Sequence, residues 1–142
     1  MKNFNLLSLV AFSLFFVGTS ATSATLAPKN AKAYIVSPLD GAKVKSPVKV
    51  VFGLEGMGVA PAGVKSPKTG HHHLLVDVKK LPNTKLPLPA DKNHIHFGGG
   101  QTETTVDLEP GEHTLQLIMG DHTHIPHNPP ILSEKITITV VK

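Results

Sequence analysis

The chain has 142 residues, with 14 basic and 10 acidic side chains, a formal net charge of +4, and no cysteine or tryptophan. The missing cysteines exclude disulfides, thiolate metal sites and cysteine nucleophiles. All the basic residues are lysines and aromatic side chains are scarce, so arginine-based phosphate recognition is excluded and a nucleic-acid partner is not expected.

The first 24 residues have the pattern of a cleaved signal peptide. Lys2 precedes an apolar run over residues 6–17, and small residues follow as far as Ala24. The run is too short to span a bilayer, and its charged start and small-residue end are typical of a secretory signal. We therefore expect a signal peptide over residues 1–24, a periplasmic or secreted protein, and no membrane span after cleavage. Residues 25–32 are expected to form a polar leader.

The remaining residues, 33–142, are predicted to form a single all-β domain. Short runs rich in β-branched residues are separated by proline and glycine. The predicted strands cover residues 33–37, 47–55, 72–78, 102–108, 113–120 and 134–141, with a short irregular piece before residue 102. This pattern predicts an immunoglobulin-like antiparallel β-sandwich of about seven short strands.

Eight of the nine histidines lie in three clusters. The clusters are His71, His72 and His73; His94 and His96; and His122, His124 and His127. In an immunoglobulin-like sandwich the three connections that carry these clusters emerge at the same end. We therefore expect the clusters to meet there. His113 lies at the turn between residues 102–108 and 113–120. It is expected alone at the other end of the sandwich, in a structural role.

The histidine spacing points to a metal site. An HxH pair in an extended segment places two imidazoles on one side, and imidazole is a good ligand for zinc, copper, nickel and iron. The candidate ligands are His71, His73, His94, His96, His122, His124 and His127, with Asp121 and, more weakly, Asp77 as carboxylates that orient a ligand ring. His72 shares the parity of Leu74 and Val76 and is assigned to structure. Because ligand imidazoles must be neutral, affinity is expected to fall below about pH 6.5.

Two methionines bear on the identity of the metal, because thioethers favour Cu(I). Met119 shares the inward parity of Leu115 and Leu117, which assigns it to the core, whereas Met57 lies in a glycine-rich loop and is open to either role. The triglycine 98–100 precedes a strand and not a helix. It is therefore interpreted as a tight backbone path and not as a phosphate cradle.

The stretches GHHHLLVD, HIHFGGGQTE, GDHTHIPHNPP and SEKITITV resemble a family of small exported bacterial domains that is catalogued only as a domain of unknown function. The resemblance covers nearly all of residues 33–142 and implies no established activity. More loosely, an exported β-sandwich with a histidine-rich end is similar to periplasmic copper carriers. That similarity implies copper, although the methionine-rich motifs of those carriers are not reproduced here.

Three functions remain open at this point. The first is an exported, non-catalytic carrier or sequestering protein for a copper or zinc ion, with another envelope protein as a further partner. The second is a structural or envelope-interaction domain whose histidines hydrogen-bond to one another and to the backbone. The third is a metal-dependent enzyme, which needs an open coordination position beside a cleft. Converging ring nitrogens favour a metal, whereas internally satisfied rings favour the second function.

Overall fold

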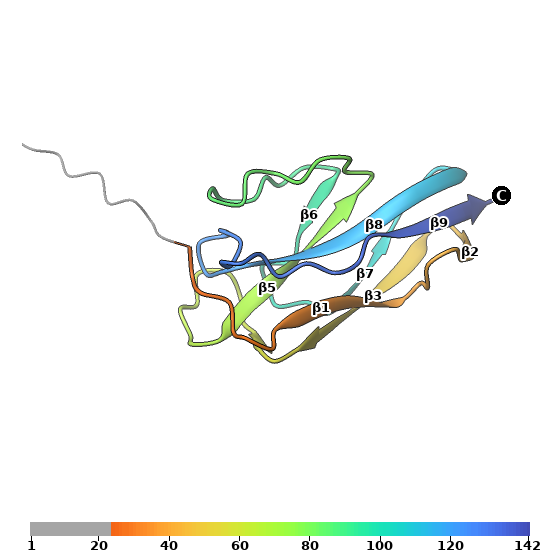
Figure 1. The fold of residues 1–142 in the computed structure, drawn as a ribbon. Helices are drawn as coiled ribbons and strands as arrows, with labels where there is room; N and C mark the ends of the chain where they lie inside the picture. Colours follow the sequence, from red (N-terminus) through yellow and green to blue (C-terminus); the bar gives the residue numbers. More distant parts are fainter. Residues whose placement is uncertain (1–23) are drawn as a thin grey trace, which may run out of the picture.

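The computed structural model describes residues 24–142, and the predicted signal peptide lies outside the described residues except for Ala24. The described part is all-β, with nine strands in two sheets (Figure 1). This confirms the predicted β-sandwich. Within the same part of the chain, no helix has the length and apolar character needed to cross a membrane.

The strands are β1 (Lys32–Ser37), β2 (Lys43–Lys45), β3 (Val48–Glu55), β4 (Gly58–Val59), β5 (Thr69–Val76), β6 (His94–His96), β7 (Glu103–Val106), β8 (Gly111–Gly120) and β9 (Ile136–Val141). One sheet has the order β1-β3-β7. The other has the order β2-β9-β8-β5-β4, and β6 pairs with β5 as well. The two-sheet arrangement places β5 between β8 on one side and β4 and β6 on the other.

Each predicted run contains a strand, and the irregular piece before residue 102 includes β6. Two strands were not predicted: β2 and β4, which have only three and two residues. Both pair in parallel, β2 with β9 and β4 with β5, so the predicted antiparallel sandwich carries two short parallel additions. Segments this short show no alternation of apolar and polar residues that a sequence pattern can reveal.

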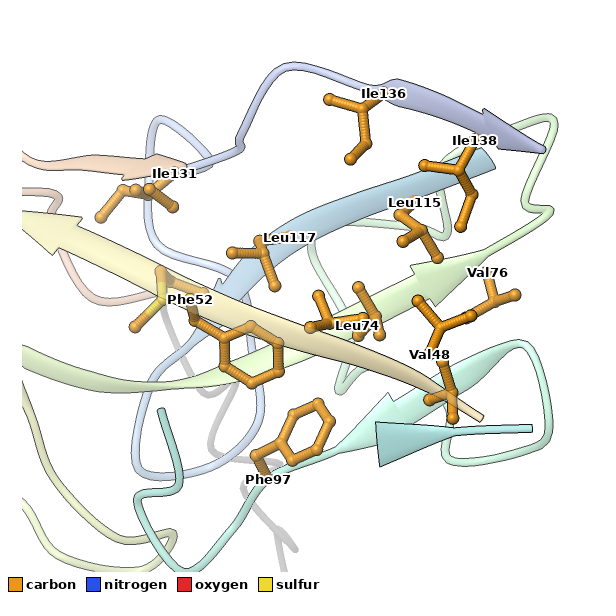
Figure 2. Close-up of a cluster of buried hydrophobic side chains, with 14 of the residues drawn as sticks. Val48, Phe52, Leu74, Val76, Phe97, Leu115, Leu117, Ile131, Ile136 and Ile138 are labelled. Carbon is orange, nitrogen blue, oxygen red and sulfur yellow. The ribbon is translucent and has the colours of Figure 1, made fainter. Parts of the chain in front are cut away.

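The core lies between the two sheets and follows from period-two alternation (Figure 2). Val48 and Phe52 of β3 face Leu74 of β5 and Leu117 of β8. Phe97, which follows β6, packs edge-on against Phe52 with ring centroids 4.8 Å apart. Full burial of an aliphatic or phenylalanine side chain stabilises a fold by roughly 1.5–3 kcal/mol. This core holds β5 rigidly in the middle of its sheet.

Both faces of β5 are buried, which is unusual for a strand of a two-layer sandwich. The face that carries Leu74 is turned toward the other sheet, whereas Leu75 is turned outward. On the outer face, Leu75 packs with Ile118 of β8 and with Leu88 from the long connection between β5 and β6. The outer residues His71 and His73, which share the parity of Leu75, are therefore also shielded from water.

The predicted polar leader is attached to the domain. Asn128, in the connection between β8 and β9, accepts a hydrogen bond from the backbone of Ala27 and donates one to Thr25. Leu26 forms a parallel bridge with Asn128, and β1 already begins at Lys32. The leader thus lies beside the connection that carries the third histidine cluster.

Candidate metal centre

One histidine or more from each of the three sequence clusters meets at a single place. His71 and His73 come from β5, His96 from β6 and His124 from the connection after β8. The ring centroid of His71 lies 5.0 Å from that of His73, 5.0 Å from that of His96 and 5.1 Å from that of His124. The rings of His96 and His124 are 4.7 Å apart. We call His71, His73, His96 and His124 the four-histidine cluster.

Strand pairing explains how three of these rings meet. His73 is the register partner of His96 in the antiparallel pair of β5 and β6, so the two side chains lie on the same face. His71 lies two residues earlier in β5 and points to that face as well. The pairing was not visible in the sequence, because β6 has only three residues.

The fourth ring is placed by the turn that follows β8. Gly120 ends β8 opposite His71, and the chain then reverses over Asp121. The backbone N–H of His124 donates to the carbonyl of Asp121, and His124 itself has a left-handed φ of 68°. This turn returns His124 over the start of β5.

Two glycines leave the room that the rings occupy. A Cβ at Gly120 would lie 2.9 Å from Nε2 of His73, and a Cβ at Gly98 would lie 2.7 Å from Nε2 of His96. Neither glycine has a positive φ, so these positions need glycine for space and not for backbone conformation. Gly98 makes room for the ring of His96, two residues earlier in the chain, whereas Gly120 makes room for His73 of a different strand.

Nitrogen atoms in these rings have no hydrogen-bond partner. Among the described residues, the buried side-chain atoms without a partner are eight imidazole nitrogens, which belong to His71, His72, His73, His96 and His127. In His71 and His73 both nitrogens are unpaired. Leaving a buried polar group unsatisfied costs about 1–3 kcal/mol, so native proteins rarely do it without a functional reason.

The same burial favours the neutral form of His71, His73 and His96. Burial lowers the pKa of His71 to about 4 and that of His73 to about 3, and repulsion from the neighbouring imidazoles adds to both shifts. Burial, followed by repulsion from His124, also lowers the pKa of His96. A neutral imidazole keeps one lone pair free, which is the form that binds a metal ion.

Asp121 shapes the turn that carries His124. Its Oδ1 accepts hydrogen bonds from the N–H and hydroxyl of Thr123 and from the N–H of Ile125, and its Oδ2 accepts from the hydroxyl of Thr25. Burial alone raises the pKa of Asp121, but these hydrogen bonds outweigh it and hold the pKa below its usual value. The buried carboxylate is therefore ionised, and its charge raises the pKa of His71. It bonds no ring, so it acts through the turn and through its field.

The other candidates lie elsewhere. Nδ1 of His94 forms a hydrogen bond with Oδ1 of Asp91 at 2.8 Å. His122 lines a cavity of about 360 Å³, together with Asp121 and Lys65. The ring of His127 is buried against Thr69 and Gly70. None of these three rings makes one of the ring pairs of the four-histidine cluster.

His72 and His113, which the sequence assigns to structural roles, and Asp77, the weaker carboxylate candidate, all lie outside the four-histidine cluster. His72 packs on Phe52 in the core, 5.1 Å between centroids, as its parity predicts. Asp77 lies just after the end of β5 and has a left-handed φ of 57°. Its Oδ2 lies 2.7 Å from Nδ1 of His113. Asp77 therefore orients His113 and none of the four clustered rings.

The geometry of the cluster fits a metal ion. One nitrogen from each of His71, His73 and His96 lies within 4.8 Å of the others. Tetrahedral nitrogen ligands about 2.0–2.1 Å from zinc are roughly 3.4 Å apart, so small ring rotations close the set. Lone pairs on neutral imidazoles suit copper and zinc alike.

The family model described as Domain of unknown function (DUF4399) matches residues 50–141, which is more than half of the chain. Neither a curated protein nor a solved structure matches the sequence.

Proposed function

Because this chain belongs to the DUF4399 family, whose description names no activity, we propose from the geometry that it binds a copper or zinc ion in the four-histidine cluster. Its role is that of an exported, non-catalytic carrier or sequestering protein. The observation that supports this proposal is the group of unpaired nitrogens on His71, His73 and His96, which are buried and face one another.

The alternative of a purely structural cluster predicts rings that hydrogen-bond to one another or to the backbone. In the four-histidine cluster, the buried nitrogens of His71 and His73 have no such partner. Unpaired, they lower the stability of the fold, whereas a bound ion turns each free lone pair into a bond. The unpaired nitrogens therefore favour a metal over internal hydrogen bonding.

A closed ligand set favours binding over catalysis. Catalytic zinc sites usually keep three protein ligands and an open position, whereas closed sites use four. Here we propose His124 as the fourth ligand, because its ring centroid lies 4.7 Å from that of His96 and 5.1 Å from that of His71, although 6.2 Å from that of His73. The cavity of about 360 Å³ is lined by Asp121 and His122 and by none of the four clustered rings.

Ion exchange has a route through the partly exposed rings. His71 and His73 are almost fully buried, but His96 and His124 keep part of their surface open to solvent. We propose that ions enter and leave past these two rings, and that a partner protein of the cell envelope loads or receives them there. The predicted signal peptide supports an envelope location.

The test is the metal content of untagged protein isolated from the periplasm without chelator, measured by mass spectrometry. The wild type should carry copper or zinc at about one ion per chain, and His96→Gln/His124→Gln should lose it. His113→Gln changes a histidine far from the cluster and serves as the matched control. Metal-free wild-type protein that also fails to bind added copper and zinc would contradict the proposal.

A further inference from the structure

Outside the four-histidine cluster, two side chains of types that can bind metal ions lie beside one backbone position. A Cβ at Gly70 of β5 would lie 2.6 Å from the backbone oxygen of Gly120, 2.8 Å from Cε1 of His127 and 3.3 Å from the methyl carbon of Met57. Gly70 has no positive φ, so the position needs glycine for space. The ring of His127 and the methyl group of Met57 therefore both lie beside Gly70, although the two residues are 70 positions apart in the sequence.

Hydrogen bonding fixes the tautomer of His127. Its Nε2 lies 3.2 Å from the backbone carbonyl of Thr69, and because a carbonyl only accepts, Nε2 carries the proton. The lone pair of the neutral ring is then on Nδ1, which is buried and has no hydrogen-bond partner. An imidazole that donates one N–H to a backbone carbonyl is the usual arrangement of a metal-binding histidine.

Met57 offers a soft ligand on the same side of Gly70 as this ring. The residue lies between β3 and β4 and is partly exposed, whereas Met119 is fully buried in the core. A thioether selects monovalent copper and similar soft ions over zinc. Its flexible side chain can reorient its sulfur without disturbing the strands.

We propose that Nδ1 of His127 and the sulfur of Met57 form a second metal site, which takes Cu(I) or another soft monovalent ion. The site shares no ligand with the four-histidine cluster and stands independently of the function proposed for that cluster. A chain with both sites would hold a divalent ion in imidazole ligands and a monovalent copper ion in a nitrogen and sulfur pair.

The experiment is a titration of the full-length chain as isolated from cells, labelled with ¹³C on the methionine methyl groups. The titrants are Cu(I) under reducing, oxygen-free conditions and, separately, Ag(I) and Zn(II). The Met57 signal is assigned from its loss in Met57→Leu, and the buried Met119 methyl is an internal control. Cu(I) and Ag(I) should shift the Met57 signal, whereas Zn(II) should leave it unchanged.

Two variants separate this site from the four-histidine cluster. His127→Gln should abolish the Met57 shift or weaken Cu(I) binding there by at least tenfold. His96→Gln/His124→Gln should leave the shift in place, even if zinc binding is lost. A Met57 signal that Cu(I) does not move, or that moves equally in His127→Gln, would overturn the proposal.

Discussion

The two ends of this sandwich hold histidine in opposite ways. At one end, Nδ1 of His113 donates to Asp77 at 2.7 Å and its Nε2 donates to the carbonyl of Glu109 at 2.8 Å. At the other end, His71 and His73 are more deeply buried and have no partner for either nitrogen. The same fold that satisfies one imidazole completely leaves the clustered ones unsatisfied.

This difference separates His113 from the candidate ligands His71 and His73. Burial lowers the pKa of His113, but the hydrogen bonds to Asp77 and Glu109 outweigh it and raise that pKa above its usual value. For His71 and His73 no interaction outweighs burial, and their pKa values fall to about 4 and 3. The hydrogen bonds of His113 therefore stabilise its protonated form, whereas the burial of His71 and His73 favours their neutral form at a cost to stability.

The largest effect is expected when an unpaired ring is replaced by an apolar side chain of similar size. His73→Leu removes a ligand and should weaken zinc or copper binding by at least about 100-fold. It also removes two buried unsatisfied nitrogens, so the metal-free protein should gain about 1 kcal/mol of unfolding free energy. Calorimetric metal titration and chemical denaturation measure the two effects.

The matched change at the other end is His113→Leu, which breaks two hydrogen bonds and leaves metal affinity within about twofold. His113→Leu should lower the free energy of unfolding of the metal-free protein, whereas His73→Leu should raise it. A metal-free His73→Leu protein as destabilised as His113→Leu would mean that His73 serves the fold, and the contrast between the ends would fail.

The next effect is the pH dependence of the metal-free protein. The pKa values of His71 and His72 are about 4 and that of His73 is about 3, all below the usual value of 6.5. Because the unfolded state then binds protons first, stability is highest above pH 6.5 and is lost as the pH falls toward the folded values. Between pH 7 and pH 6 the free energy of unfolding should fall by about 2 kcal/mol in total.

Urea denaturation of chelator-treated protein at both pH values measures this change. His113 contributes with the opposite sign, so the His113→Gln background should show a slightly steeper fall. Stability that is flat or rises toward pH 6 would show that the clustered rings are not held neutral by burial.

These pKa values also change the expectation for metal binding. Free imidazoles would begin to lose metal below about pH 6.5, as the sequence alone suggests. In the folded cluster the pKa of His71 is about 4 and that of His73 is about 3, so affinity should begin to decline at a lower pH than it would with free imidazoles. Affinity that persists at pH 5 is therefore compatible with histidine ligands in this protein.

A smaller effect is expected from filling the space beside the rings. Gly120→Ala places a Cβ 2.9 Å from Nε2 of His73, and because His73 is buried it cannot move away freely. We expect metal affinity to fall by about tenfold, since a ring misplaced by a few tenths of an ångström binds poorly. Isothermal titration with zinc measures the change.

The control is Gly58→Ala in β4, where the new Cβ meets only Thr69 at 3.5 Å, an ordinary contact. This variant should bind metal as the wild type does. Equal affinity in Gly120→Ala and wild type would show that the cluster is not closely packed against β8.

Much of the fold followed from the sequence, because the apolar runs of β3, β5, β8 and β9 are long enough to detect, with clear alternation of burial in β9 and in the first half of β3. The short strands β2, β4 and β6 depend on pairing with longer neighbours, which no local pattern reveals. The conformation of Asp77 was also hidden, since a left-handed φ at a non-glycine residue is set by its contacts with Thr114 and His113.

The meeting of the histidine clusters was predictable because connections at one end of a sandwich lie together. Which rings face one another was not. His94 and His96 have the same parity, yet Asp91 holds the ring of His94 and only His96 joins the cluster. Parity places two side chains on one face, but the partner that each ring finds is decided by distant segments.

The negative charge of Asp121 near His71 provides a further test of how the clustered end of the sandwich differs from the end that holds His113. Asp121→Asn keeps the oxygen that accepts from Thr123 and removes the charge near His71. Affinity for a divalent ion should fall by about fivefold, because a buried carboxylate no longer offsets the charge of the ion. Thr25→Val removes only the hydrogen bond to Oδ2 and should leave affinity within about twofold. Equal losses in the two variants would assign the effect to loop geometry and not to charge.

The smallest effect concerns His113, whose two ring nitrogens are both hydrogen-bonded. Because the pKa of His113 is raised, its ion pair with Asp77 stabilises the fold fully below pH 6.5, and this stability is lost as the pH rises through the folded pKa. His113→Gln should therefore cost about 1 kcal/mol at pH 5.5, a figure kept low because the Asp77 side chain is 40% exposed, and less at pH 8.5. The difference between wild type and variant, measured by denaturation at both pH values, isolates His113 from the clustered rings. A cost that grew with pH would mean that His113 is held neutral, and the two ends of the sandwich would then treat histidine alike.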